Sequence, residues 1–149
     1  MGFDLYAIEK EIKEYLQAEY PAYPFYTNQI PEDEAMPRTD GEVLPFFVIQ
    51  NGPLTPRVRG KNVAGVRHDE YYSWVQIICI SSVEDDCSAA LSMVTDKLTG
   101  YKTALHTALV PDGSTTDYGS RQYSVRPVIF YRSQRFEFNV KSSAEPLVP

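Results

Sequence analysis

Residues 70–101 read EYYSWVQIICISSVEDDCSAALSMVTDKLTGY and predict a buried strand that runs directly into a capped helix. The first half is nearly continuous in aromatic and β-branched side chains, which favours a strand inside a sheet. Ser82 stands at the expected N-cap of the helix, and Glu84, Asp85 and Asp86 follow in its first turn, where carboxylates offset the positive helix pole. The segment specifies a fold strongly and contains no group arranged for catalysis.

The helix after this strand is expected to bury one apolar face and to end at Gly100. Cys79 in the strand and Cys87 in the helix both lie at apolar positions, so we expect two buried free thiols and no disulfide framework. The expected buried positions of the helix are Val83, Cys87, Ala90, Leu91, Val94 and Leu98.

Length and composition predict one globular domain. The chain has 149 residues, of which 43% are apolar and 23% charged, and this balance argues against wholesale disorder. We assign the domain to residues 1–141 and expect a flexible tail at 142–149. The N-terminus lacks the form of a signal peptide, and no apolar run approaches the roughly 20 residues that span a bilayer, so we expect synthesis in the cytoplasm and no membrane contact.

The negative charge is concentrated in the first third of the chain. The net charge is −6, and residues 1–56 hold ten acidic against three basic side chains. Since phosphate neutralisation dominates nucleic-acid affinity, an acidic chain is a poor general binder of nucleic acid. The asymmetry fits a subunit whose one side meets the other side of an identical neighbour, and it fits an ordinary solvated surface equally well.

Other segments predict a first helix and several strands. Asp4 is the expected cap of a helix that ends at Tyr20, with its apolar stripe facing inward and Glu9 among the side chains that face water. The strand 43–50 contains Pro45, which suggests an edge position or a bulge. The remaining expectations are a short strand near an edge at 25–30, a strand or short helix at 103–110, a turn and loop at 111–119, and strands at 123–131 and 134–141 that could form one long bent strand.

Two polar loops carry opposite charge. The long connection 53–70 holds a basic group, and loops of this length inside a domain are usually functional or disordered; it could also be an extended hairpin turning at Asn62. The loop 31–42 is acidic and supplies the complementary charge that a heterologous ring interface requires. The interface candidates are therefore Arg57, Arg59, Lys61 and Arg67 in the first loop and Glu32, Asp33 and Glu34 in the second.

Motifs of known chemistry are not found. Gly60 and Gly65 have the spacing of a phosphate loop, but no Gly-Lys-Ser/Thr ends the motif. His68 and His106 lack companions at metal-ligand spacing, and the Glu84–Asp86 run is explained by helix capping. We therefore expect no catalytic residue, no metal and no cofactor.

Basic residues interleave with tyrosines in the last third of the chain, an arrangement that can bind a single nucleic-acid strand by charge and stacking. Contact with acidic loops of a neighbouring subunit is the competing interpretation. The residues concerned are Arg121, Arg126, Arg132, Arg135 and Lys141, with Tyr118, Tyr123 and Tyr131 among them.

With these residues in view, the chain resembles the tail terminator proteins of long-tailed bacteriophages, also called tail completion or minor tail proteins. The resemblance is one of layout over nearly the whole chain. It comprises the amphipathic helix 4–20, the segment PFFVIQNGPLTPR (45–57), the strand and acid-capped helix ending in LTGY (98–101), and the late strand FYRSQRFEFNV (130–140).

The resemblance implies an α+β fold, with a mixed, mainly antiparallel sheet and two main helices packed on one face of a single domain. It further implies a homo-hexameric ring in the virion that ends the tail tube, joins it to a head–tail connector protein and passes DNA through its lumen without specific binding. The long basic loop would then contact the tube or neighbouring subunits. The alternatives are another connector component such as a stopper or adaptor, a small single-strand nucleic-acid-binding module, and a small enzyme that uses the acidic loop.

Overall fold

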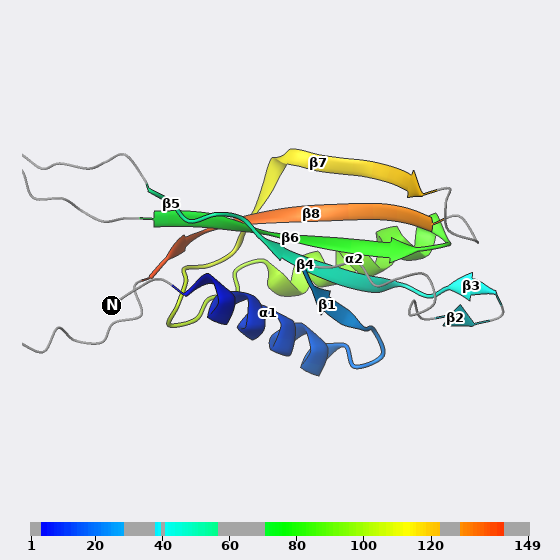
Figure 1. Ribbon diagram of the computed structural model, residues 1–149, viewed down its shortest axis with the longest axis horizontal. Helices are drawn as coiled ribbons and strands as arrows, with labels where there is room; N and C mark the ends of the chain where they lie inside the picture. The colour runs from blue at the N-terminus through cyan, green and yellow to red at the C-terminus, as the bar shows by residue number, and fades with distance from the viewer. Residues whose placement is uncertain (1–3, 29–37, 40, 57–70, 123–128, 142–149) are drawn as a thin grey trace, which may run out of the picture.

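The computed structural model describes residues 4–28, 38–39, 41–56, 71–122 and 129–141 (Figure 1). They form an α+β fold in which two helices pack on one face of a mixed, mostly antiparallel sheet, as expected. In chain order the elements are α1 (Leu5–Glu19), β1 (Phe25–Thr27), β2 (Arg38–Thr39), β3 (Glu42–Val43), β4 (Phe46–Asn51), β5 (Thr55–Pro56), β6 (Tyr71–Ser81), α2 (Glu84–Leu98), β7 (Val110–Gln122) and β8 (Ile129–Val140).

The long strand β6 lies at the centre of the sheet, as the sequence predicted for its aromatic and β-branched run. The strand order is β1-β4-β6-β8-β7, and β5 pairs with the start of β6. All pairings are antiparallel except that of β1 with β4. The expected edge position of β1 is confirmed. The edge position expected for the strand with Pro45 is wrong, because β4 pairs with a strand on each side; the predicted strand 43–50 is instead interrupted at this proline, which lies between β3 and β4.

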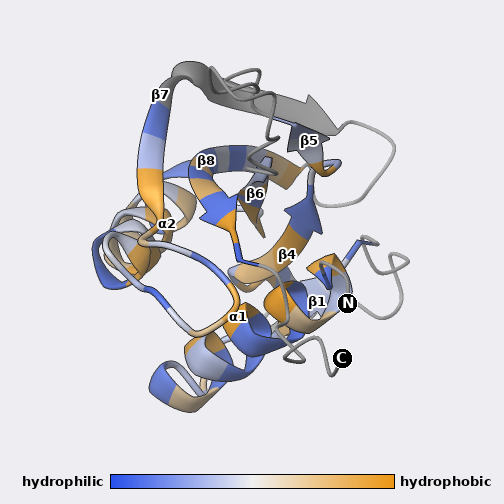
Figure 2. Cartoon of the chain, turned by 90° about the vertical axis from the view of Figure 1, so that its left-hand side faces the viewer, coloured by the Kyte–Doolittle hydropathy of each residue, from blue (hydrophilic) through white to orange (hydrophobic). Residues whose placement is uncertain are grey.

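The main core fills the space between the sheet and both helices, which lie on the same side of the strands in Figure 2. Alternate residues of β6 and β8 face this layer, as the period of a strand requires. We call it the helix-side core. It comprises Ile8, Ile12 and Leu16 of α1, Cys87, Ala90, Val94 and Leu98 of α2, and Phe25, Phe47, Ile49, Val75, Ile77, Cys79, Leu109, Phe136, Phe138 and Val140.

The start of α1 confirms the predicted cap, because the Asp4 carboxylate accepts a hydrogen bond of 2.9 Å from the backbone N–H of Ala7. Glu9, however, does not face water. Its side chain is buried and accepts a hydrogen bond of 2.7 Å from Asn28, which has a positive φ of 62° just after β1. A buried carboxylate is tolerated where a donor satisfies it, and here the donor ties α1 to the end of β1.

The predicted cap of α2 is wrong by one residue. Val83 holds the N-cap position and makes no side-chain cap bond, whereas the Ser82 hydroxyl accepts from the backbone N–H of Val43 at 2.8 Å and donates to Glu42. Backbone pairing with β3 therefore continues to Ser82 and leaves its hydroxyl unable to cap the helix. The three carboxylates do occupy the first turn, while Val83 is exposed and Leu91 only half-buried.

Residues 101–122 depart most from expectation. Residues 101–109 form neither a strand nor a helix; they make a strap that crosses the end of β8, with one isolated bridge between His106 and Val140. The segment 111–119, expected as turn and loop, lies within β7, whose pairing with β8 is irregular between Asp112 and Ser120. The described part of the last two predicted strands forms one strand, β8, which pairs with β6 in unbroken register over residues 130–140. Residues 123–128 and the proposed tail at 142–149 lie outside the described part.

A second, smaller cluster lies on the sheet face away from the helices, near the ends of β4 and β6. Phe46 packs there at right angles to Tyr26, with ring centroids 5.7 Å apart. We call it the second-face cluster; its buried members are Val43, Phe46, Val48, Ile80 and Ile129.

Candidate interface site

The seven predicted interface residues all lie outside the described residues, in the segments 29–37 and 57–70. What the structure does place is the base of the basic loop. Thr55 pairs with Tyr72 and Pro56 with Tyr71 in antiparallel register, so both ends of the loop are held side by side at one end of β6. The hairpin proposed around Asn62 lies outside the described residues.

A groove opens at the other end of the sheet, between α2 and the segments that precede β1 and β4. We call it the α2 groove; its volume is about 370 Å³, and it is lined by Tyr23, Pro45, Asp86, Ala89, Ala90 and Met93. Asp86 lies three and four residues before Ala89 and Ala90, and Met93 lies three and four residues after Ala90 and Ala89, so the four α2 residues share one face of the helix. Small alanines at the middle positions form the floor, and the tyrosine and proline form the opposite wall.

Exposed apolar side chains occur in the α2 groove, at Met93, and in the chain next to it, at Leu44 and Val83. Met93 is 36% exposed, Leu44 41% and Val83 38%. Leu44 and Val83 lie next to one another in the fold, because the Ser82 N–H donates to the Val43 carbonyl at 3.1 Å. Isolated exposed apolar residues are ordinary, but a group of them beside a groove is the usual mark of a contact surface.

The electrostatics at this end of α2 are acidic. Asp85 and Asp86 are exposed, and both stand in the first turn, where the helix dipole favours negative charge. Glu84 is paired with Arg132 of β8 at 3.0 Å, which fixes the start of the helix on the sheet. The acidic run predicted as a helix first turn thus also borders a groove.

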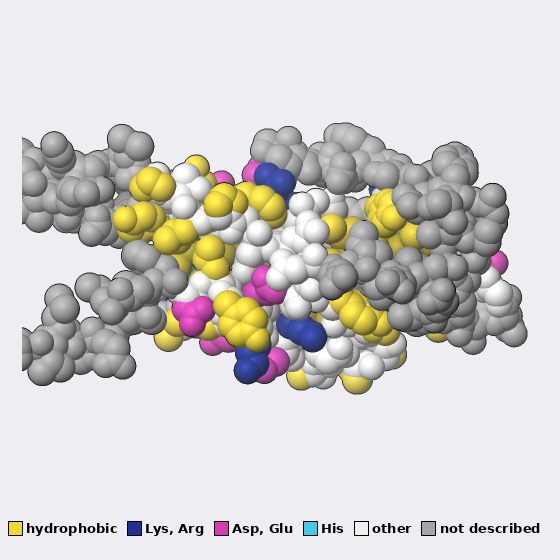
Figure 3. Space-filling model, viewed as in Figure 1, with side chains coloured by type: hydrophobic (Ala, Val, Ile, Leu, Met, Phe, Trp, Pro, Cys, Tyr) yellow, Lys and Arg dark blue, Asp and Glu magenta, His cyan; other side chains and the backbone are white. Residues whose placement is uncertain are grey.

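The surface of α1 offers a contrast. Figure 3 shows acidic, basic and apolar side chains interspersed there. Tyr6 is 73% exposed on this helix, and the small depression beside it is lined by Lys10, Lys13, Glu9 and Glu14 as well. Mixed charge of this kind is typical of a solvated helix face.

The second face of the sheet carries an ordered aromatic and charged row. The Trp74 indole covers the buried Gly52, and the Arg135 guanidinium lies 4.0 Å from the centre of the indole ring. Since Arg135 stacks on Trp74 and Arg132 pairs with Glu84, two of the five basic residues proposed for nucleic-acid contact already have partners within the chain.

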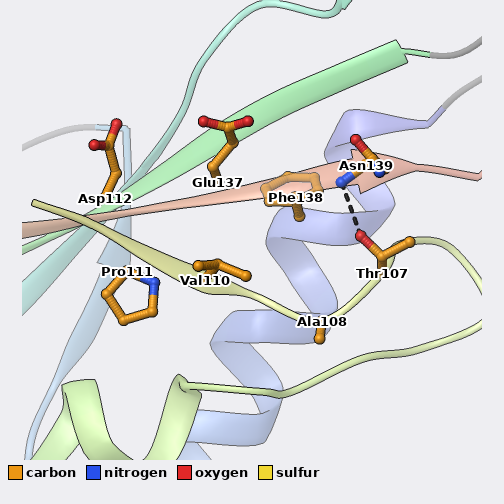
Figure 4. Close-up of a pocket in the computed structure, with 8 residues that line it drawn as sticks. All are labelled: Thr107, Ala108, Val110, Pro111, Asp112, Glu137, Phe138 and Asn139. Carbon is orange, nitrogen blue, oxygen red and sulfur yellow. Dashed lines mark hydrogen bonds between the residues drawn. The ribbon is translucent and has the colours of Figure 1, made fainter. Parts of the chain in front are cut away.

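A second pocket, of about 330 Å³, lies where the strap meets β7 and β8. In Figure 4 the carboxylates of Asp112 and Glu137 point to the same side of these strands, and the Asn139 backbone N–H donates to the Thr107 hydroxyl at 2.9 Å. Backbone bonds from Thr107 to Asn139 and from Lys141 to Leu105 hold the strap in place. The pocket therefore follows from how the strap is attached.

His106 is the buried centre of the strap. Its ring packs against Tyr101 and Phe138, Nδ1 lies 2.6 Å from the Thr107 carbonyl, and Nε2 has no hydrogen-bond partner. Burial lowers the pKa of His106, because the charged ring loses its hydration. A neutral imidazole packed in this way is a structural group.

The two cysteines are free and buried, as predicted. The Cys87 thiol donates to the Cys79 carbonyl at 3.0 Å, and a hydrogen bond between the two thiols, together with burial, raises the pKa of Cys79 far above the usual range. The Cys79 thiol is therefore held in the protonated, unreactive form.

Within the described ranges, no three His, Cys, Asp or Glu side chains gather where they could hold a metal ion. In the same ranges, neither helix has the length and apolarity needed to cross a bilayer.

The α2 groove was missed by the sequence analysis for a physical reason. Ala89 and Met93 lie beside the predicted apolar stripe of α2, and the opposite wall comes from Tyr23 and Pro45, which are distant in sequence. The available signal was Met93, a large apolar residue outside the buried stripe. Only the packing of α2 against the segments before β1 and β4 creates the groove.

The structure thus defines an α+β domain that carries the base of a basic loop at one end and an acid-bordered apolar groove at the other. No known protein-family model matches this chain, and a comparison with curated proteins gives no match.

Proposed function

We propose that this chain is a structural protein of a bacteriophage virion. It forms a ring at the end of the tail tube, terminates tail assembly and joins the tail to the head connector. The observation that carries the proposal is the layout of the domain. A mixed, mostly antiparallel sheet with both helices on one face is the arrangement that the resemblance to tail terminator proteins implies, and the base of the long basic loop lies at one end of this sheet.

The proposed mechanism is binding alone. Identical subunits associate through unlike surfaces, which is how a heterologous contact closes into a ring. Further contacts join the ring to the tube protein on one side and to a connector protein on the other. DNA passes through the lumen, and we propose that it does so without specific binding.

Native mass spectrometry and negative-stain microscopy of the purified chain test the ring. Six copies of a 16.9 kDa chain give about 101 kDa. We expect this mass and a ring with a central opening, together with binding to the ends of tail tubes assembled from the tube protein of the same phage. A chain that stays monomeric, both alone and with tubes, overturns the proposal. A ring that binds the connector but not the tube end assigns the chain to a stopper or adaptor role.

A nucleic-acid-binding module is the alternative from a different class. It requires binding to a single strand that weakens steeply with added salt. The engagement of Arg132 and Arg135 within the chain argues against it. Fluorescence anisotropy with a labelled oligonucleotide at low salt decides between the two, and we expect no binding.

A further inference from the structure

We propose that the α2 groove receives the basic segment 57–67 of a second copy of this chain. This inference rests on the proposed function, because it requires that subunits associate. It adds which two surfaces meet. Its starting point is the groove itself, which is lined by the small residues Ala89 and Ala90 and by the exposed Met93. An apolar groove of this kind accepts the apolar side chains of an inserted segment.

The composition of the segment matches that of the groove. Residues 57–67 read RVRGKNVAGVR, in which three valines lie among four basic residues and no acidic residue occurs. The groove presents Ala89, Ala90 and Met93 to the valines, and Asp86 lines it for the basic side chains, with the exposed Asp85 next to it in the same helix turn. Oppositely charged rims around an apolar centre give an interface both its specificity and its rate of association.

The reach of the loop decides which copy supplies the segment. Residues 57–70 are fourteen, and their two ends are held side by side by the pairing of β5 with β6. The tip of such a loop extends at most seven residues, or about 24 Å, from its base. The Pro45 end of the groove lies beside Ser81, at the far end of the eleven-residue β6, which spans about 35 Å. The loop therefore cannot reach that end of the groove in its own subunit.

The two surfaces also lie at opposite ends of the molecule. Figure 1 shows β5 at one end of the sheet and the start of α2 near the other. Docking of one subunit's loop on the next subunit's groove is thus a head-to-tail contact. Each added subunit leaves one loop and one groove unused at the ends of the assembly. Subunits can therefore continue to add until the last loop meets the first groove and a ring closes.

Complementary variants test the contact. Ala89→Arg fills the floor of the groove from an exposed helix position, and the triple variant Arg57→Glu/Arg59→Glu/Lys61→Glu reverses the charge of the segment. Each variant alone should remain a monomer under conditions in which the wild type forms its ring, with association weakened about 30-fold or more. Sedimentation velocity measures the masses, and circular dichroism confirms that each variant is folded.

Mixing the two variants gives the decisive measurement. The Ala89→Arg subunit keeps an intact loop and the triple variant keeps an intact groove, so one good contact remains between them. We expect a one-to-one heterodimer that grows no further. Tyr6→Arg, which places the same side chain on the mixed-charge surface of α1, serves as the control and should leave the ring unchanged.

The outcomes separate this inference from the proposed function. A wild-type ring that persists in Ala89→Arg, or two variants that fail to pair on mixing, overturns the docking of 57–67 in the α2 groove and leaves the ring standing. A wild-type chain that is monomeric with and without tail tubes overturns both. Met93→Lys repeats the test at a second groove position and should behave as Ala89→Arg does.

Discussion

The two faces of the sheet differ in what covers them and in what holds them together. The helix-side core joins α1, α2 and four strands through closely packed aliphatic and aromatic side chains. Among the described residues of the second face, a buried cluster lies at one end, and the other end carries the stack of Gly52, Trp74 and Arg135. Both faces contain fully buried residues. On the helix side these residues pack against two helices, whereas on the second face they pack within a small cluster of strand residues.

This difference teaches how stability and contact surfaces are divided in the molecule. The helix-side core fixes the position of α2 relative to β4, and the α2 groove exists only because that position is fixed. A loss of packing in this core should therefore affect both folding and association. A change at the Trp74 end of the second face, far from the groove, should affect folding alone.

Neighbouring phenylalanines offer the sharpest test of the comparison. Phe47 faces the helix-side core, where its ring stacks on Phe25 at 4.9 Å, and Phe46 faces the second-face cluster; both are fully buried. We expect Phe47→Ala to lower the free energy of unfolding by about 4 kcal/mol, and Phe46→Ala by about 3 kcal/mol because its smaller cluster collapses more readily. Urea denaturation measures both. Equal losses would show that the two faces contribute alike.

Gly52→Ala tests the stack on the second face. A Cβ at this position would overlap the Trp74 ring, and the carbonyl of Gly52 already accepts from the Ser73 hydroxyl at 3.0 Å, so the backbone cannot easily shift. We expect a loss of about 2 kcal/mol from overpacking. The same change made in a Trp74→Ala background should cost much less. A full loss in that background would place the strain elsewhere.

His106 should give the smallest effect, as a dependence of stability on pH. Burial lowers the pKa of His106 in the folded state, and the positive charge of Lys141 lowers it further. The Thr107 carbonyl and Glu11 act in the opposite direction, but burial has the larger effect. The unfolded chain therefore binds the proton first, and stability decreases as the pH falls below the usual value of 6.5 until the folded-state pKa is passed.

The control for this dependence is His106→Phe, which keeps a ring between Tyr101 and Phe138. The difference in urea midpoint between wild type and variant isolates the contribution of this one histidine from those of the carboxylates. A difference that does not change between pH 7.5 and 5 would contradict the burial argument.

Several features could be predicted from the sequence because they depend on local periodicity. Asp4 caps α1, the alternation at Phe136, Phe138 and Val140 gives a strand with one buried face, and the cysteines lie at apolar positions of elements that bury them. Ser82 could not be assigned correctly, because its hydroxyl is taken by β3, a strand forty residues earlier. The sequence 111–119 favours turns by composition, but long pairing with β8 makes it β7.

The candidate site divides in the same way. Charge and loop length identified the basic segment from sequence, since neither depends on how distant residues pack. The α2 groove depends on Tyr23, Pro45 and Met93, which meet only when the helix lies on the sheet. The limited reach of the loop likewise follows from the pairing of β5 with β6.

The sequence by itself thus determined the fold class, the two helices, the central strand and the acidic and basic segments, because patterns of polarity act over a few neighbouring residues. Tertiary structure alone decided which strands are neighbours, how the strap attaches and where the apolar groove opens. Those features arise from contacts between residues far apart in the chain, and their free energy is gained only when all the elements pack together.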